Sequence, residues 1–117
     1  MVKIRSPKHF YDQLFKQNFY FSIGVKSSYF IAQIKKYLGI VYEKDLSESA
    51  GHCISFGHTQ GSIIWVWVKN KSLTHIIHEA NHAVCFTFQN VSLNHVDAND
   101  ELYSYYLEML VKIIRSK

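Results

Sequence analysis

The chain has 117 residues, of which 48% are hydrophobic and 19% are charged, so it can bury one core and is too apolar for a disordered segment. The formal net charge is +4, with basic residues gathered near both ends and acidic residues more frequent late in the chain. The two cysteines form no C-x-x-C pair, which excludes a cysteine-rich zinc finger. No signal peptide and no apolar run of about 20 residues is visible, so we expect a soluble, cytoplasmic protein without membrane contact.

The first part of the sequence predicts a short helix, a strand and a second helix. Ser6-Pro7 is typical of a helix start, and an apolar stripe follows it as far as Phe15. Aromatic and β-branched residues over 19–25 favour a strand. Residues 27–38 have their apolar positions on one side of a helix and end at a glycine, which predicts a helix with a glycine stop.

Two strands and two helices are predicted in the second part. Residues 52–56 alternate and are expected at a sheet edge, whereas 63–68 are apolar on both faces and are expected at the sheet centre. Helices are predicted over 72–88 and 100–114. The order of elements predicts a single α+β domain over residues 1–117 with a small three-stranded mixed sheet. The residues expected to face the core from the two late helices are Ile77, Ala80, Val84, Phe88, Leu102, Tyr106, Met109 and Ile113.

The predicted long helix carries the pattern H-E-x-x-H at residues 78–82. Two residues four apart lie one turn apart on nearly the same helix face, so His78 and His82 can bind one zinc ion at about 2.0–2.1 Å. Glu79 is not a ligand in this pattern, and its carboxylate can take a proton from the metal-bound water. The alternative is a pair of partly exposed histidines beside a solvated acid that the helix dipole favours.

A third metal ligand is expected because catalytic zinc sites commonly have three protein ligands and keep one position for water. Glu101 lies 19 residues after His82, near the start of the last predicted helix. If the two helices pack antiparallel, Glu101 can return beside the metal. A metal there would also relieve the cost of a partly buried carboxylate.

These two motifs resemble those of the gluzincins, the thermolysin-like zinc peptidases, which place H-E-x-x-H on one helix and a glutamate on a later one. The family's second motif is close to Asn-Glu-x-x-Ser-Asp, and this sequence has Asp-Glu-Leu-Tyr-Ser-Tyr over 100–105. Glu101 and Ser104 match, but Tyr105 replaces the aspartate that orients a zinc-bound histidine in the family. The size and element order over roughly 19–114 are similar to those of minigluzincins. The first motif is also similar to that of small predicted metallopeptidases encoded by phages and mobile elements.

The resemblance implies a minimal zincin-like fold with Zn²⁺ bound by His78, His82 and Glu101. It also implies a peptidase in which zinc-activated water hydrolyses a peptide bond with Glu79 as general base. The substrate would be a peptide or protein that lies extended along the edge strand over 52–56. Such chemistry needs a donor for the developing oxyanion, and the candidates left open are His58, His95, Tyr103 and Tyr105.

Two other functions fit the same sequence. The chain can be a weakly active or inactive zincin-fold binding or regulatory protein that acts on a host protein or a nucleic acid through its edge strand or its basic ends. It can also be a structural domain of a larger assembly. The tyrosine-rich last helix would suit a homodimer interface in either case.

Overall fold

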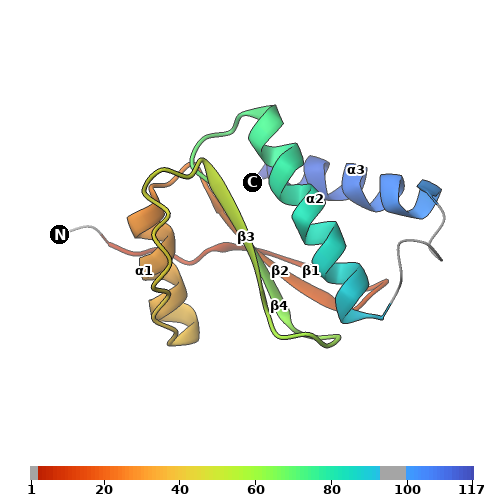
Figure 1. The fold of residues 1–117 in the computed structure, drawn as a ribbon, viewed down its shortest axis with the longest axis horizontal. Coiled ribbons are helices and arrows are strands. Elements are labelled where there is room, and N and C mark those ends of the chain that lie inside the picture. Colours follow the sequence, from red (N-terminus) through yellow and green to blue (C-terminus); the bar gives the residue numbers. More distant parts are fainter. Residues whose placement is uncertain (1–2, 93–99) are drawn as a thin grey trace.

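The structure, a computed structural model, describes residues 3–92 and 100–117. These residues form a small α+β domain that consists of a four-stranded mixed sheet and three helices (Figure 1). Along the chain, the elements are β1 (Lys8–Asp12), β2 (Gln17–Ile23), α1 (Ser27–Leu38), β3 (Gly51–Phe56), β4 (Ile63–Val68), α2 (Leu73–Asn90) and α3 (Asp100–Ser116).

The strand order in the sheet is β1-β2-β4-β3. β2 and β4 are parallel, whereas β1 pairs antiparallel with β2 and β3 pairs antiparallel with β4. β4 lies inside the sheet, and its residues from Ile64 to Val68 are all buried, as is typical of a strand that is covered on both faces. The predicted central position of 63–68 and the predicted edge position of 52–56 are both confirmed.

The prediction of a helix after Ser6-Pro7 is wrong, because this segment forms β1 and a tight turn into β2. The Asp12 carboxylate accepts hydrogen bonds from the backbone N–H groups of Leu14, at 3.3 Å, and Phe15, at 3.0 Å. An aspartate that binds the backbone two and three residues later favours a turn over a helix. The sheet therefore has four strands rather than the three predicted from the sequence.

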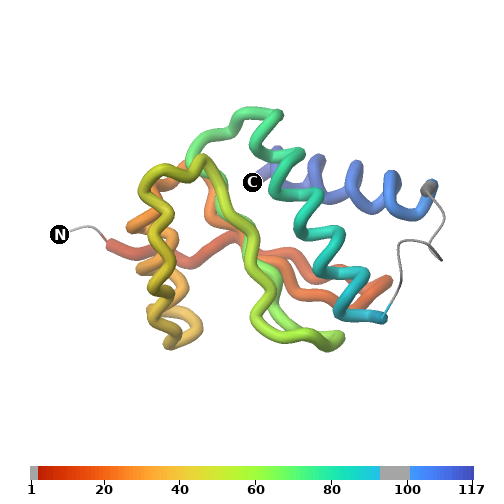
Figure 2. Tube along the Cα trace, viewed as in Figure 1, coloured from red at the N-terminus to blue at the C-terminus, as the bar shows by residue number. Residues whose placement is uncertain are grey.

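In Figure 2 α1 lies on one side of the strands and α2 with α3 on the other, and alternate residues of the central strand contribute to a core on each side. Ile64, Val66 and Val68 pack on one face of the sheet against α2 and α3. Trp65 and Trp67 pack on the other face against Phe30 and Ile34 of α1 and against Leu46. The metal-ligand candidates on α2 are thus carried by a helix whose inner face is fixed to the middle of the sheet.

The predicted apolar stripes of the late helices are partly wrong. In α2, Ile77 is 42% exposed and Ile76 takes its place in the core. In α3, Tyr106, Leu110 and Ile114 are buried, whereas Leu102, Met109 and Ile113 are only partly buried. At these positions the buried residue is the direct neighbour of the predicted one, as with Ile76 for Ile77, Leu110 for Met109 and Ile114 for Ile113. Several apolar residues lie side by side in the sequence there, so the pattern does not single out the buried one. Within the described residues, no helix is long and apolar enough to cross a membrane.

Candidate metal centre

The two histidines of the H-E-x-x-H pattern lie on consecutive turns of α2. Their ring centroids are 4.9 Å apart, with the planes at 81° to each other. Candidate ligand atoms of His78, Glu79 and His82 all lie within 4.8 Å of one another. In the part of the chain that the structure describes, this is the one group of three such side chains.

The donor set fits a divalent metal ion. Both histidines are exposed, so a metal can reach them without opening the fold. Burial, followed by the nearby His78, lowers the pKa of His82 and so favours the neutral imidazole that a metal needs. Nitrogen ligands suit zinc, although they also suit other transition metals.

Glu79 differs from the histidines because its side chain is 7% exposed and turns toward β3. A Cβ atom on Gly51 would lie 2.9 Å from Glu79 Cγ and 3.0 Å from its Oε2. The carboxylate therefore occupies the space that any other residue at position 51 would fill. Burial raises the pKa of Glu79, while the nearby His78 opposes that shift. A carboxylate of raised pKa is a stronger base at neutral pH.

A cavity of about 330 Å³ joins this group to the edge strand. Its walls come from α2, from β3 and from the loop before β3, and the lining residues are Lys44, Gly51, His52, Cys53, His78, Glu79, His82 and Phe86. The His52 Nε2 atom lies 2.8 Å from the Tyr42 hydroxyl. Burial, then Lys44 and His82, lower the pKa of His52.

Sequence reasoning missed Lys44, Gly51 and His52 as residues of this cavity. They come from a loop and a strand that precede the motif by more than 25 residues, and only the pairing of β3 with β4 brings them beside α2. A glycine at the start of a predicted edge strand was the one local signal, since it permits close approach of another group.

Glu101 is exposed in the first turn of α3 and lies outside the group formed by His78, Glu79 and His82. The same end of α3 does contact α2, because the Tyr103 hydroxyl donates a hydrogen bond to Asn81, the residue before His82. Tyr103 also lies 3.8 Å from the Cys85 sulfur. Glu101 is therefore on a segment that borders the motif, without being a neighbour of the two imidazoles in this structure.

Among the described residues, the candidate oxyanion donors His58, Tyr103 and Tyr105 do not line the cavity. Tyr105 is 65% exposed and lines a separate hollow on α3. His58 is exposed in the turn between β3 and β4, and His95 lies outside the described residues. Burial, together with Cys85, raises the pKa of Tyr103 to about 12, so its hydroxyl stays protonated at neutral pH.

No known protein family, curated protein or solved structure matches this chain. What the described residues define is thus a small α+β domain with an exposed pair of helix histidines, a buried glutamate between them and an adjoining edge strand.

Proposed function

We propose that the chain is a zinc-dependent peptidase. The observation that carries the proposal is the position of the buried Glu79 carboxylate within 4.8 Å of the ligand atoms of two exposed histidines, in a cavity bordered by an edge strand. Burying a carboxylate is costly unless something compensates for it, so a buried carboxylate in a cavity is a candidate for a functional residue.

His78 and His82 would hold the zinc ion, with Glu101 as the proposed third ligand. When bound, zinc supplies positive charge that polarises a carbonyl oxygen and makes a water more acidic. Glu79 then accepts the proton of the attacking water on its carboxylate and passes it to the leaving amine. Gly51 leaves the room in which that carboxylate is held.

The edge strand β3 suits a substrate in extended form. β3 pairs with β4 along one side, and in the described residues no strand pairs with its other side. An extended peptide can add to such an edge through its main chain, which binds many sequences with little dependence on side chains. Gly51 and His52 of the same strand line the cavity, so a peptide on this edge would pass beside Glu79.

The test is Glu79→Gln in the full chain. The amide cannot accept the proton, so hydrolysis of a peptide library should fall by at least about 100-fold, the usual contribution of a general base. Zinc content, measured by mass spectrometry of the purified protein, should stay the same, because His78 and His82 are intact. Glu108→Gln, which changes an exposed acid of α3, is the control and should keep full activity.

Full activity of Glu79→Gln would refute the mechanism. If both proteins carry stoichiometric zinc and neither cleaves any peptide, the domain is a zinc-binding module without turnover. If purified protein neither holds zinc nor gains thermal stability when zinc is added, the metal site itself is refuted.

A further inference from the structure

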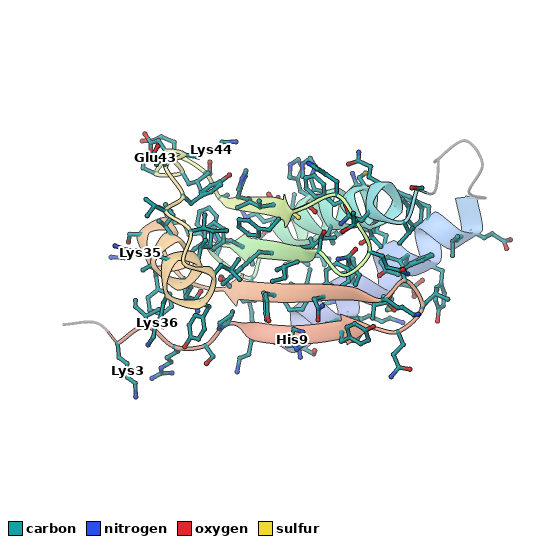
Figure 3. The ribbon with its side chains drawn as sticks, turned by 90° about the horizontal axis from the view of Figure 1, so that it is seen from below. Lys3, His9, Lys35, Lys36, Glu43 and Lys44 are labelled. Atoms are coloured by element: carbon teal, nitrogen blue, oxygen red, sulfur yellow. The ribbon has the colours of Figure 1, made fainter. Side chains whose placement is uncertain are left out.

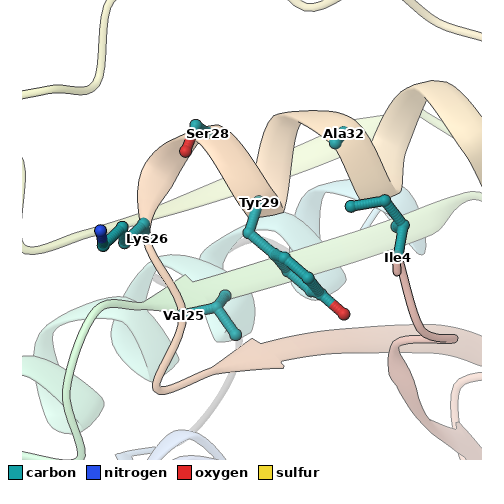
Figure 4. A pocket seen from close by; sticks show the side chains of 6 residues that line it. All are labelled: Ile4, Val25, Lys26, Ser28, Tyr29 and Ala32. Carbon is teal, nitrogen blue, oxygen red and sulfur yellow. The ribbon is translucent and has the colours of Figure 1, made fainter. Parts of the chain in front are cut away.

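Two further hollows lie around the N-terminal segment and α1. None of their lining residues belongs to the candidate metal centre. One hollow, of about 210 Å³, is polar and has the cationic side chains Arg5, Lys8 and Lys117 in its wall. The other, of about 470 Å³, is largely apolar and is lined by Ile4, Val25, Lys26, Ser28, Tyr29 and Ala32 (Figure 4). Val25 and Tyr29 line both hollows, which therefore adjoin each other.

Arg5, one of the cations of the polar hollow, lies on a segment whose backbone is hydrogen-bonded to α1. Tyr29 and Gln33, one turn apart on α1, hold residue 5 through its main chain. The Arg5 N–H donates to the Tyr29 hydroxyl at 2.8 Å, and Gln33 Nε2 donates to the Arg5 carbonyl at 2.9 Å. The Lys36 ammonium donates to the Ile4 carbonyl at 2.9 Å.

This attachment continues into the core as a chain of buried hydrogen bonds. Trp65 Nε1 on the central strand donates to the Ser22 hydroxyl at 2.7 Å, which donates to Gln33 Oε1 at 2.6 Å. Ser22 and Gln33 are 2% and 4% exposed, so these bonds form away from water and hold their geometry. Both bonds of residue 5 use its backbone, which leaves the Arg5 guanidinium available to a ligand.

The charged side chains in the walls of the two hollows are all positive. No acidic residue lines either hollow. In the described ranges, the one ion pair joins Lys112 and Glu108 on α3, so the side chains of Arg5 and Lys8 have no carboxylate partner, whereas Lys117 Nζ donates to the His9 carbonyl at 3.4 Å. Lys3, Lys35 and Lys36 lie at the same end of the molecule as α1 (Figure 3). A concave site with several unpaired cations favours an anion with more than one charged oxygen, and the arginine fork matches phosphate.

We infer that the two hollows bind a nucleoside phosphate unit, with the phosphate between Arg5 and Lys8 and the base in the apolar hollow against Tyr29. The phosphate needs fixed cations and the base needs an apolar, partly aromatic wall, and the two hollows supply these side by side. In Figure 4 the Tyr29 ring lies between Val25 and Ile4, where it lines the hollow that the base would enter. The unit can be part of a single nucleic-acid strand or a free nucleotide.

The first experiment measures binding of a short labelled oligodeoxythymidine to the full chain by fluorescence anisotropy at several salt concentrations. Replacing Arg5 and Lys8 by alanine should weaken binding by at least about 10-fold and should reduce the slope of log affinity against log salt by about 0.7, the contribution of the one phosphate contact on a single strand that these two side chains make. The control is the double change Lys69→Ala and Lys71→Ala, which removes the same charge from exposed positions between β4 and α2 and should have little effect. Equal weakening by the two double variants would overturn the site.

The second experiment tests the base with an abasic strand of the same length and charge. Loss of stacking should weaken its binding by at least about 5-fold, because a stacked base contributes about 1–3 kcal/mol. Equal affinity for the two strands would overturn the assignment of the apolar hollow. This comparison uses the unaltered protein, so no folding defect can produce its result.

Competition with thymidine monophosphate distinguishes the two sources of the ligand. Displacement of the strand by low concentrations of the mononucleotide would identify a free nucleotide, and displacement only at high concentrations would identify a strand. Binding to vesicles of phosphatidylserine without binding to either nucleotide ligand would overturn the inference. The affinities should be the same in Glu79→Gln, so failure here leaves the proposed peptidase untouched, and failure of the peptidase leaves this site untouched.

Discussion

At the scale of single residues, Gly51 and Glu79 depend on each other. Glu79 can bury its carboxylate beside two histidines only because the first residue of β3 has no side chain. A Cβ atom added at position 51 would also lie 2.8 Å from the carbonyl oxygen of Trp67 on the neighbouring strand. Position 51 is thus closed on two sides, by the sheet and by the proposed general base.

Gly51→Ala should therefore separate the position of Glu79 from metal binding. The added methyl group pushes the carboxylate from its place, so we expect kcat for peptide hydrolysis to fall by at least about 10-fold, as a misplaced general base would. Zinc content should not change, because His78 and His82 are not touched. Crowding against the Trp67 carbonyl should lower the free energy of unfolding by about 1–3 kcal/mol, measured by urea denaturation.

Gly61→Ala is the matched control for this change. Its Cβ would meet nothing within 4 Å, but its φ of 90° strains any residue with a side chain. It should lose about 1–3 kcal/mol of stability and keep its activity. A folded, zinc-loaded Gly51→Ala protein with the kcat of the unaltered chain would show that Glu79 does not need its present position.

At the scale of elements, a buried hydrogen bond joins the β1–β2 hairpin to α3. The Tyr106 hydroxyl, on a fully buried ring, donates to Asp12 Oδ2 at 2.7 Å. Asp12 is 6% exposed and also accepts the two N–H groups of its own turn. One carboxylate thus closes the hairpin and attaches it to the last helix, 94 residues away in the sequence.

Tyr106→Phe should lower the free energy of unfolding by about 1–3 kcal/mol at neutral pH, because it removes one donor from a buried carboxylate. Tyr105→Phe, at an exposed neighbour, should change it by less than about 0.5 kcal/mol. Chemical denaturation of both variants measures the difference. Equal stability of the two would mean that the hairpin does not depend on this bond.

The pH dependence of the same variant has a definite sign. Burial, followed by the hydrogen bond to Asp12, raises the pKa of Tyr106 above its usual value of 10.0. Above that pH the unfolded chain releases the proton while the folded protein keeps it, so the unaltered protein loses stability as pH rises. Tyr106→Phe has no such proton, and the stability gap between the two proteins should narrow above pH 10.

The hairpin also shows where prediction from the sequence stops. The H-E-x-x-H pattern placed His78, Glu79 and His82 correctly on one helix because helical spacing is a local property. The segment after Ser6-Pro7 satisfied helical spacing equally well, yet it pairs with β2, and that pairing was not part of the local pattern. Gly51 and His52 were not predicted as residues of the cavity for the same reason, because only the pairing of strands brings β3 beside α2.

At the scale of the whole molecule, the two proposed sites lie at opposite edges of the sheet. The candidate metal centre lies where α2 meets the β3 edge, and the basic hollows lie around α1 and the segment that leads into β1 at the other edge. Each region draws on residues from distant parts of the sequence. The location of the charges is thus more informative than their sum, because Arg5, Lys8 and Lys117 line one hollow, whereas Lys44 is the one lysine or arginine in the wall of the proposed peptidase cavity.

The proposed metal site also bears on how α2 and α3 are joined across the domain. Tyr103 links the start of α3 to Asn81, next to His82, and we propose that Glu101, in the same turn of α3, becomes a ligand. If it does, zinc would hold the two helices together, and any ligand that binds only the folded state raises its stability. A zinc concentration of about 100 times Kd would then add about 2.7 kcal/mol to the free energy of unfolding.

Glu101→Gln should weaken zinc binding by at least about 10-fold, since even groups that merely support a ligand cost that much when removed. Glu108→Gln, two turns further along α3 and exposed, should bind zinc as tightly as the unaltered chain. Competition with a coloured chelator gives both affinities, and the shift of the melting temperature with added zinc should shrink in the first variant alone. Equal affinities would confine the site to α2, where His78 and His82 would hold the ion without α3, and the proposed likeness to the gluzincins would then lack its third ligand.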